Sequence, residues 1–410
     1  MRSSRFGFIT QAINSSAPST VPPTKLLILR PIAIGKQDRE SSDLMLSARR
    51  LSMLQNIITD LGSSYNVSVG DKTRLQNALK DAVSRKKFLL VMDDVWSESE
   101  NVWSEVLRVP LNNGAPGSPV LVTTRNVGVA RKMKARVIHR VDKIEQDAWI
   151  LLKKQVAIYE SDEGDIDTLE DIGMRILEKC DGLPLAIKAV GGLLLNKGST
   201  RGVWEYVCNH YTWSLEGINE DINRAIYLSY EDLPSHLKQC FLFCSLFPKD
   251  ELIIREDVVK LWMAEGYMQD NTSSKQPHDL GSGYYKELIS RNLLNPDEAY
   301  YGQQACNMHD VVRTFVRFIT KGVLVSEEQN VINNTLSTLK LRHLSISNKT
   351  VDFKSLREQS AVRTLMSFGS TTIQLQDLLN NLSCLRILYL NKMDLIELSN
   401  SICHQKHLRC

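Results

Sequence analysis

The stretch KKFLLVMDDVW, residues 86 to 96, decides the fold class, because an apolar run ends there on two adjacent acids. An uninterrupted apolar run of this length predicts a strand buried on both faces, as in a parallel sheet. The carboxyl end of such a strand is the edge at which α/β sheets bind ligands. Two neighbouring carboxylates repel each other unless a cation lies near, so Asp93 and Asp94 predict a Mg²⁺ site for a nucleotide phosphate. The alternative is an acid pair exposed in a loop.

Strand and helix patterns alternate around this run. Strands are predicted at 25–30, 120–126 and 136–141, and helical spacing is found at 46–61 and 73–85. Alternation of this kind predicts a parallel α/β sheet. The chain then changes character, because residues 146 to 215 have helical spacing with Gly and Pro breaks. Short helices with room for a hairpin near 292–308 follow, an arrangement typical of a winged helix.

Four related segments recur near the C-terminus. LRHL begins at residue 341, VRTL at 362, LRIL at 385 and LRC at 408. A period of 20 to 29 residues with the pattern L-x-x-L-x-L is typical of leucine-rich repeats, in which each repeat contributes one strand. Chance recurrence in a leucine-rich chain is the alternative.

The composition excludes several classes of protein. The chain has 410 residues, 43% of them apolar, with a net charge of +3, which suits two to four globular domains. Its eight cysteines have no disulfide-framework spacing, which indicates a reducing compartment. Cys240, Cys244, Cys306 and His309 could form a zinc site, but no second closely spaced pair follows. No apolar run is long enough to cross a bilayer, so no integral membrane segment is predicted.

Taken together, the motifs resemble plant nucleotide-binding leucine-rich-repeat immune receptors of the coiled-coil type, which carry an NB-ARC module. The resemblance runs from about residue 48 to the end. KKFLLVMDDVW resembles the Walker B motif of that family, including Trp96. The other matching motifs, in chain order, are GSPVLVTTRN (117–126), CDGLPLAIKAVGGLL (180–194), YLSYEDLPSHLKQCFLFCSLFPKD (227–250), VVKLWMAEGYM (258–268) and MHD (308–310).

The resemblance assigns roles to the acids and to the strand beside them. It implies that Asp93 holds Mg²⁺ and that Asp94 positions or activates the attacking water, the one catalytic role in the set. Arg125, directly after Thr124, would read the γ-phosphate, because a guanidinium can bind phosphate oxygens in pairs. An ordinary surface arginine is the alternative for Arg125.

Further nucleotide contacts are implied downstream. Gly182 and Leu183 would shape a turn that presses Pro184 against the adenine ring. His309 would contact the β-phosphate of ADP and hold the winged helix against the nucleotide domain. The alternatives are an ordinary helix break at Pro184 and a structural histidine at 309.

The fold expected from this resemblance is a multidomain α/β + α protein. It would combine a partial P-loop NTPase-like parallel sheet, a helical bundle, a winged helix and the start of a leucine-rich-repeat solenoid. The predicted divisions are an atypical or disordered leader at 1–47, a partial nucleotide-binding domain at 48–145, a helical domain at 146–215, a winged helix at 216–325 and the first repeats at 330–410.

One expected motif does not occur in the sequence. A phosphate loop reads G-x-x-x-x-G-K-[ST], because glycine amides must surround the phosphates. Gly35 and Lys36 are followed by Gln37, and Pro31 stands where the first glycine of the loop should be. The segment GDKT at 70–73 does not match the loop either, because Asp71 separates its glycine from its lysine. We therefore expect an N-terminally truncated or rearranged chain that is also cut within its repeats, with impaired nucleotide binding.

The expected function is that of an ADP/ATP-switched plant immune receptor in the defence response, with Mg²⁺ as the accompanying metal. Slow ATP hydrolysis would reset the switch, and whether this chain is an enzyme stays open. Expected partners are a pathogen effector or a guarded host protein at the repeats, and homo- or hetero-oligomers with relatives. A catalytically silent decoy or regulatory partner of full-length relatives is the alternative function.

Two other expectations concern nucleic acid and location. The basic residues of the winged-helix segment, Arg255, Lys260, Arg313 and Arg317, are interleaved with acids, so no nucleic-acid partner is expected. The expected location is cytoplasmic, with a peripheral plasma-membrane location as the alternative. Residues 1–37 contain no acid, as transit peptides do, yet a leader without a targeting role is favoured.

Overall fold

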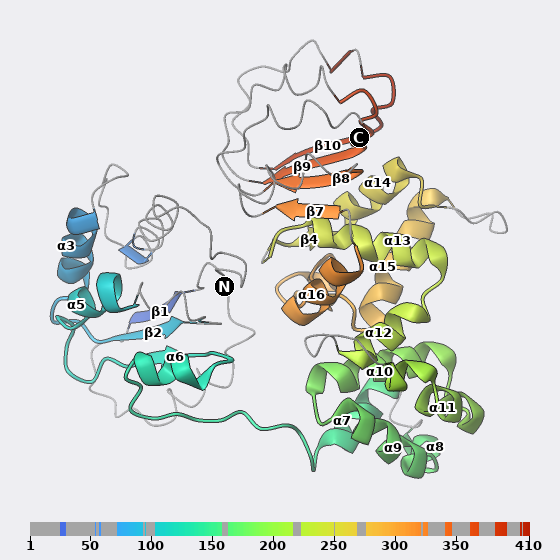
Figure 1. The fold of residues 1–410 in the computed structure, drawn as a ribbon, viewed down its shortest axis with the longest axis horizontal. Coiled ribbons are helices and arrows are strands. Elements are labelled where there is room, and N and C mark those ends of the chain that lie inside the picture. Colours follow the sequence, from blue (N-terminus) through green and yellow to red (C-terminus); the bar gives the residue numbers. More distant parts are fainter. Residues whose placement is uncertain are drawn as a thin grey trace. The chain divides into compact units, whose positions relative to one another are not determined.

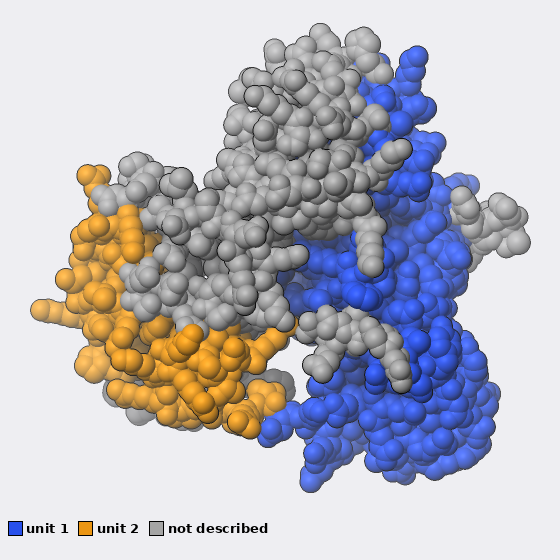
Figure 2. Space-filling view, viewed as in Figure 1, with its two compact units in different colours: residues 1–4, 142–410 blue, residues 5–141 orange. Residues whose placement is uncertain are grey.

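The computed structural model describes most of the chain in two compact units. The described residues are 25–29, 54, 57–58, 72–92, 95, 103–157, 163–215, 223–249, 251–268, 276–320, 323–326, 341–346, 361–368, 382–391, 402–403 and 405–410. The sheet unit comprises residues 5–141, and the helical unit comprises residues 142–410 with residues 1–4 (Figure 2). No helix in the described ranges is both long and apolar enough to cross a membrane.

The sheet unit is built on three parallel strands, β1 (Lys25–Leu29), β2 (Phe88–Met92) and β3 (Val120–Val122), in the order β1-β2-β3 (Figure 1). All five residues of the central strand β2 are buried, so the prediction of a buried parallel strand is confirmed. The helical elements whose bounds the structure describes in this unit are α3 (Lys72–Val83), the π-helix η3 (Trp103–Leu107), α5 (Arg108–Leu111) and α6 (Val127–Lys132).

Two N-terminal predictions concern the same sheet. β1 confirms the strand predicted at 25–30, and it lies inside the segment 1–47 that we expected to be a leader. Of the helix predicted at 46–61, the structure describes Leu54, Ile57 and Ile58, which are helical and buried in the core of the sheet unit. Their spacing places them on one face of a helix. Gly35 and Lys36 lie outside the described residues.

The strand predicted at 136–141 is wrong. The segment is not a strand, and its side chains are exposed, with Val137 at 84% and Val141 at 92%. Val137 and Ile138 are adjacent, so they point to opposite faces of an extended chain, and charged residues surround them. One face would carry Ile138 between Arg136 and Arg140, and the other would carry His139 between Val137 and Val141. Both faces of the segment would therefore include basic side chains, which disfavours pairing it in the sheet.

The first part of the helical unit, residues 142–215, is a helical bundle that confirms the helical prediction there. Its elements are α7 (Ala148–Val156), α8 (Glu163–Asp167), α9 (Glu170–Cys180), α10 (Pro184–Lys197), α11 (Arg201–Cys208) and the 3₁₀-helix η5 (Tyr211–Ser214). α10 is apolar on several sides, as a helix enclosed by neighbours must be. It packs against α7 and against α12 (Arg224–Glu231).

The next part contains a small antiparallel sheet of β4 (Ile253–Ile254), β6 (Ala305–Asn307) and β5 (Asn295–Pro296), in that order. The last two strands are the hairpin predicted near 292–308. The surrounding elements are α13 (Ser235–Phe243), η6 (Cys244–Leu246), α14 (Arg255–Glu265), α15 (Pro277–Ser290), η7 (Tyr301–Gln303) and α16 (Asp310–Ile319). Large side chains, among them Trp262, Tyr285 and Phe315, fill a core that they share.

The unit ends in a parallel sheet of β7 (Val323–Ser326), β8 (His343–Ile346), β9 (Thr364–Phe368) and β10 (Ile387–Asn391). The strands follow one another in space in chain order (Figure 1). β8, β9 and β10 each begin at the third residue of a predicted repeat segment, and their first residues are register partners. One strand per repeat is thus present at each of these three segments.

A buried acid joins this sheet to α14. Glu265 is 6% exposed and accepts a hydrogen bond from the Thr364 hydroxyl, and Arg386 Nη1 lies 3.8 Å from its Oε2. His343 Nδ1 lies 3.7 Å from Glu265 Oε1. Burial nevertheless lowers the pKa of His343, because it outweighs the opposing effect of the Glu265 carboxylate, and the nearby arginines lower that pKa further.

The closest approach of α10 to α15 predicts a steric effect. A Cβ at Gly192 would lie 2.6 Å from Arg291 Cα, so Gly192→Ala should destabilise the helical unit by about 1–3 kcal/mol. Gly202 in α11 has nothing within 4 Å of its Cβ position, so Gly202→Ala should be neutral or stabilise by up to about 1 kcal/mol. Thermal unfolding of both variants checks this, and equal melting temperatures would contradict the close packing.

Candidate functional site

The end of β2 is held against the residues that follow β3. Thr123 donates its N–H to Met92 O at 2.9 Å, and Val95 donates its N–H to Thr123 O at 2.9 Å. Asp93 and Asp94, which come between Met92 and Val95 in the sequence, lie outside the described residues. Their roles at a metal and at a water therefore stay predictions.

Thr124 and Arg125 follow directly. The Thr124 hydroxyl donates to Val95 O at 2.7 Å and accepts from the Asn126 N–H at 3.2 Å. The bond to Val95 O connects the residues after β3 to the residue that follows the acid pair, so the hydroxyl has a structural role. Arg125 is exposed, so its guanidinium is accessible from solvent. The structure brings these two residues together, and a contact of either with nucleotide stays a prediction.

Gly182 forms the turn before α10. Its φ is +62°, and its carbonyl accepts from the Ile144 N–H at 2.9 Å. A Cβ there would lie 2.8 Å from Ile144 O and 2.9 Å from Lys143 Cβ. Only glycine fits both the backbone angle and the close neighbour, which agrees with a turn shaped by this residue.

Pro184 occupies the first position of α10, where its missing N–H costs nothing. Leu183 before it is extended and supplies no side-chain cap. Both side chains are exposed, with Leu183 at 40%. The start of α10 therefore presents an apolar surface to its surroundings, a surface that could support a flat ring.

His309 caps the N-terminus of α16. Its Nδ1 accepts from the Val311 N–H at 3.2 Å, so in the neutral ring the proton is on Nε2. An Nε2–H group is a hydrogen-bond donor of the kind that a phosphate oxygen accepts. The neighbours differ in role, because Met308 is buried in the core and Asp310 forms an ion pair with Lys249 at 2.9 Å.

Sequence reasoning missed a charged cluster where α10 and α15 meet. Arg291, whose side chain is 7% exposed, lies 3.0 Å from Asp232 and 2.9 Å from Glu287. Lys197 at the end of α10 reaches the other Asp232 oxygen at 2.6 Å. Two cations thus share one carboxylate, which fixes the position of α10 against α15. The sequence could not reveal the pair of Arg291 and Asp232, because the two residues lie 59 positions apart.

The cysteines of the winged-helix part are buried thiols. Burial raises the pKa of Cys306 to about 12, and it raises the pKa of Cys244 well above its usual value. Both groups therefore stay protonated near neutral pH. Among the described residues, no group of three or more His, Cys, Asp or Glu is placed to hold a metal ion.

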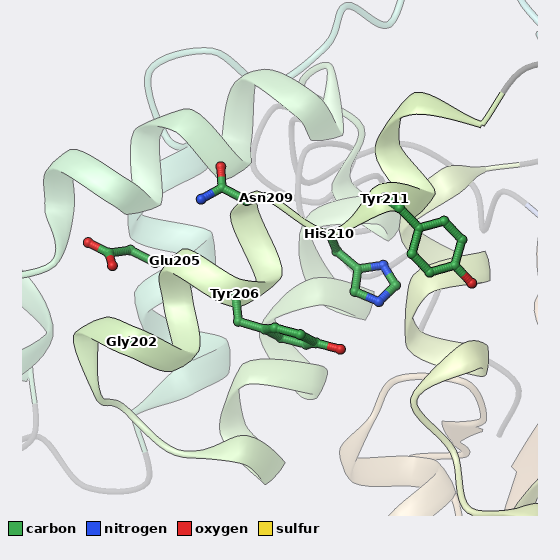
Figure 3. A pocket seen from close by; sticks show the side chains of 6 residues that line it. All are labelled: Gly202, Glu205, Tyr206, Asn209, His210 and Tyr211. Carbon is green, nitrogen blue, oxygen red and sulfur yellow. The ribbon is translucent and has the colours of Figure 1, made fainter.

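A surface cavity of about 480 Å³ lies elsewhere in the helical unit. It is lined by residues of α11 and the turn after it, namely Gly202, Glu205, Tyr206, Asn209, His210 and Tyr211 (Figure 3). The side chains of Glu205 and Asn209 point away from those of Tyr206 and His210 (Figure 3). None of the predicted nucleotide-contacting residues lines this cavity, so it is not the site that the motifs predict.

The predicted residues are divided between the two units. Thr124 and Arg125 belong to the sheet unit, and Gly182, Pro184 and His309 belong to the helical unit.

The turn at Gly182 allows a test with a matched control. Gly182→Ala should destabilise the helical unit by about 2–4 kcal/mol, because the left-handed angle and the contact with Ile144 O both oppose a side chain. Gly302→Ala has a similar positive φ, +67°, but nothing within 4 Å, so it should cost only about 1 kcal/mol. Denaturant unfolding measures both variants. An equal loss of stability would show that the contact with Ile144 has no effect.

Comparisons with known proteins give two family matches. Residues 45–162 match the NB-ARC domain, and residues 246–316 match the disease resistance protein winged helix domain. Disease resistance RPP13-like protein 4 of Arabidopsis thaliana is 32% identical over 87% of the chain and 42% of its own length. Disease resistance protein RGA2 of Solanum bulbocastanum is 35% identical over 59% of the chain and 24% of its own length.

The chain thus spans less than half the length of these curated relatives. The two matched domains follow each other in the order that the motifs predict, and the second contains His309. The chain belongs to the plant disease resistance proteins that carry an NB-ARC domain.

Proposed function

We propose that the chain is the switch region of a plant innate immune receptor whose state depends on bound ADP or ATP. The observation that carries this proposal is the order of the two family matches, an NB-ARC domain followed by a disease resistance winged helix. A small domain that carries a phosphate-facing histidine can change its position when the nucleotide changes, and that change would be the signal.

Several of the residues described above would contribute to a nucleotide site. The exposed Leu183–Pro184 surface suits the adenine ring, and the Nε2–H of His309 suits a phosphate oxygen. Arg125 would supply positive charge at the end of β3. Mg²⁺, when bound, would neutralise phosphate charge, with Asp93 as its ligand and Asp94 beside the water. A phosphate loop is the part that this sequence does not contain.

We further propose that β7 to β10 are the first strands of a leucine-rich-repeat solenoid. Their in-register parallel pairing supports this, as does the apolar column of Leu341, Val362 and Leu385, all fully buried. In the whole protein, this part would bind a pathogen effector or a guarded host protein. Oligomers with related receptors, slow ATP hydrolysis as a reset and a cytoplasmic location complete the proposal.

The immune role can be tested in the plant that carries the gene. Disrupting the gene should increase the growth of some pathogen isolates and leave others unchanged, because a receptor of this kind recognises particular partners. The wild-type gene and a His139→Ala variant, altered at an exposed histidine outside the repeats, should both restore resistance. A His309→Ala variant should not restore the wild-type level of resistance. Equal pathogen growth on disrupted and parent plants, across a broad set of isolates, would contradict the proposal.

Nucleotide binding by the 410-residue chain should be weak. A phosphate loop supplies several charge-assisted hydrogen bonds, each worth about 1.5–3 kcal/mol, so its absence should reduce affinity about 10³-fold or more. Titration calorimetry with ADP and ATP in the presence of Mg²⁺ measures this, with a relative that has the loop as control. Micromolar affinity for ADP in this chain would contradict the expectation.

A further inference from the structure

A buried arginine lies one helical turn after His309. Arg313 in α16 is 4% exposed, and its backbone N–H donates to His309 O at 2.9 Å. Its guanidinium donates through Nη1 to Ser245 O at 3.2 Å and to Phe247 O, and through Nη2 to Pro248 O at 3.3 Å. Arg313 is one of the basic residues considered above for nucleic-acid binding, and it is buried against backbone carbonyls.

This arrangement suits arginine and no other side chain. The three carbonyl oxygens belong to the end of η6 and the turn after it, where the last carbonyls of a helix lack intrahelical donors. A planar guanidinium presents several donors in a fixed fork, whereas a lysine ammonium is a single compact charge. Arg313 therefore fixes the shape of the turn 245–249 and holds it against α16.

A second contact holds the same turn to the start of α16. Lys249 Nζ lies 2.9 Å from Asp310 Oδ2, and both side chains are partly buried. The segment 245–249 is thus attached to the first turn of α16 at two residues, Asp310 and Arg313. The ring of His309, which caps Val311 N, is oriented by this same first turn.

The other side of the turn contacts the C-terminal parallel sheet. The Phe247 ring is 1% exposed, and its centroid lies 5.8 Å from that of Phe368 in β9 and 6.2 Å from that of Tyr389 in β10. Phe368 and Tyr389 also contact each other, at 5.6 Å. Phe247 therefore touches α16 through its carbonyl and the sheet through its ring.

We infer that Arg313 is a positioning residue that couples His309 to strands β9 and β10 through the turn 245–249. A displacement of β9 or β10, such as a partner bound to the repeats would cause, moves the Phe247 ring. The Phe247 carbonyl moves with it, and Arg313 transmits that shift to the start of α16. The meaning of this coupling as regulation rests on the proposed function, whereas the coupling itself is a property of the fold.

Hydrogen exchange of the full 410-residue chain, followed by mass spectrometry, tests the coupling. Arg313→Met should accelerate exchange on the order of tenfold or more in α16 and also in β9, because three carbonyls lose their donor. Arg313→Lys should give a smaller change in both places. Phe247→Leu, which keeps an apolar side chain but removes the ring contacts, should also accelerate exchange in both. Arg317→Met, at an exposed position of the same helix, should change neither.

The remote element α9 distinguishes coupling from general loss of structure. Its exchange should stay unchanged in every variant. Faster exchange confined to the turn 245–249, or an equal increase in α9, would overturn the inference. If Arg313→Met does not fold, Arg313→Lys and Phe247→Leu decide the question in the same way.

Nucleotide measurements keep this inference separate from the proposed function. If the wild-type chain binds no ADP at any concentration, alone or within the complete receptor, the proposed function is contradicted and the coupling is not affected. A normal nucleotide response, combined with a β9 that ignores the Arg313 and Phe247 variants, would remove the coupling alone.

Discussion

The helical unit depends on the burial of α10 between two cores. Ile187, Val190 and Leu194 belong to the core of the helical bundle, whereas Ala189 belongs to the core of the winged-helix part. A helix that serves two cores cannot present a polar face along most of its length, which explains its apolar composition. Gly192 then allows the backbone of α15 to approach, so the two parts pack as one body at this helix. Pro184, at the start of the same helix, takes its position from both cores.

Charges buried in the helical unit lie where its parts meet. Arg291 joins α15 to Asp232, Glu265 joins α14 to the parallel sheet, and Arg313 joins α16 to the turn before β4. Buried ionic groups add little net stability, because the cost of removing them from water offsets most of their attraction. They do penalise any arrangement in which a partner is missing. Contacts of this kind fit a protein whose parts must adopt defined relative positions.

Local patterns predicted much of the fold. The apolar run FLLVM predicted the buried strand β2, and the apolar spacing of 73–85 predicted α3. A strand begins at the third residue of the repeat segments that start at 341, 362 and 385. The strand expected at 136–141 did not form, because basic side chains would lie on both of its faces and its apolar residues are exposed. The family motifs located Gly182 and His309, whose turn and capping roles the structure describes. Arg291 and Arg313 could not be foreseen, since their partners lie about 60 residues away and a basic residue is usually exposed.

The parallel sheet at the C-terminus has a consequence for how such a protein can change over evolutionary time. Each strand bonds only to its immediate neighbours, and α14, Phe247 and the residues around them contact strands that are already present. New units can therefore be added beyond the last strand, or exchanged there, without rebuilding any core described above. Sequence differences can therefore accumulate in such added strands while the helices packed against the first strands stay the same.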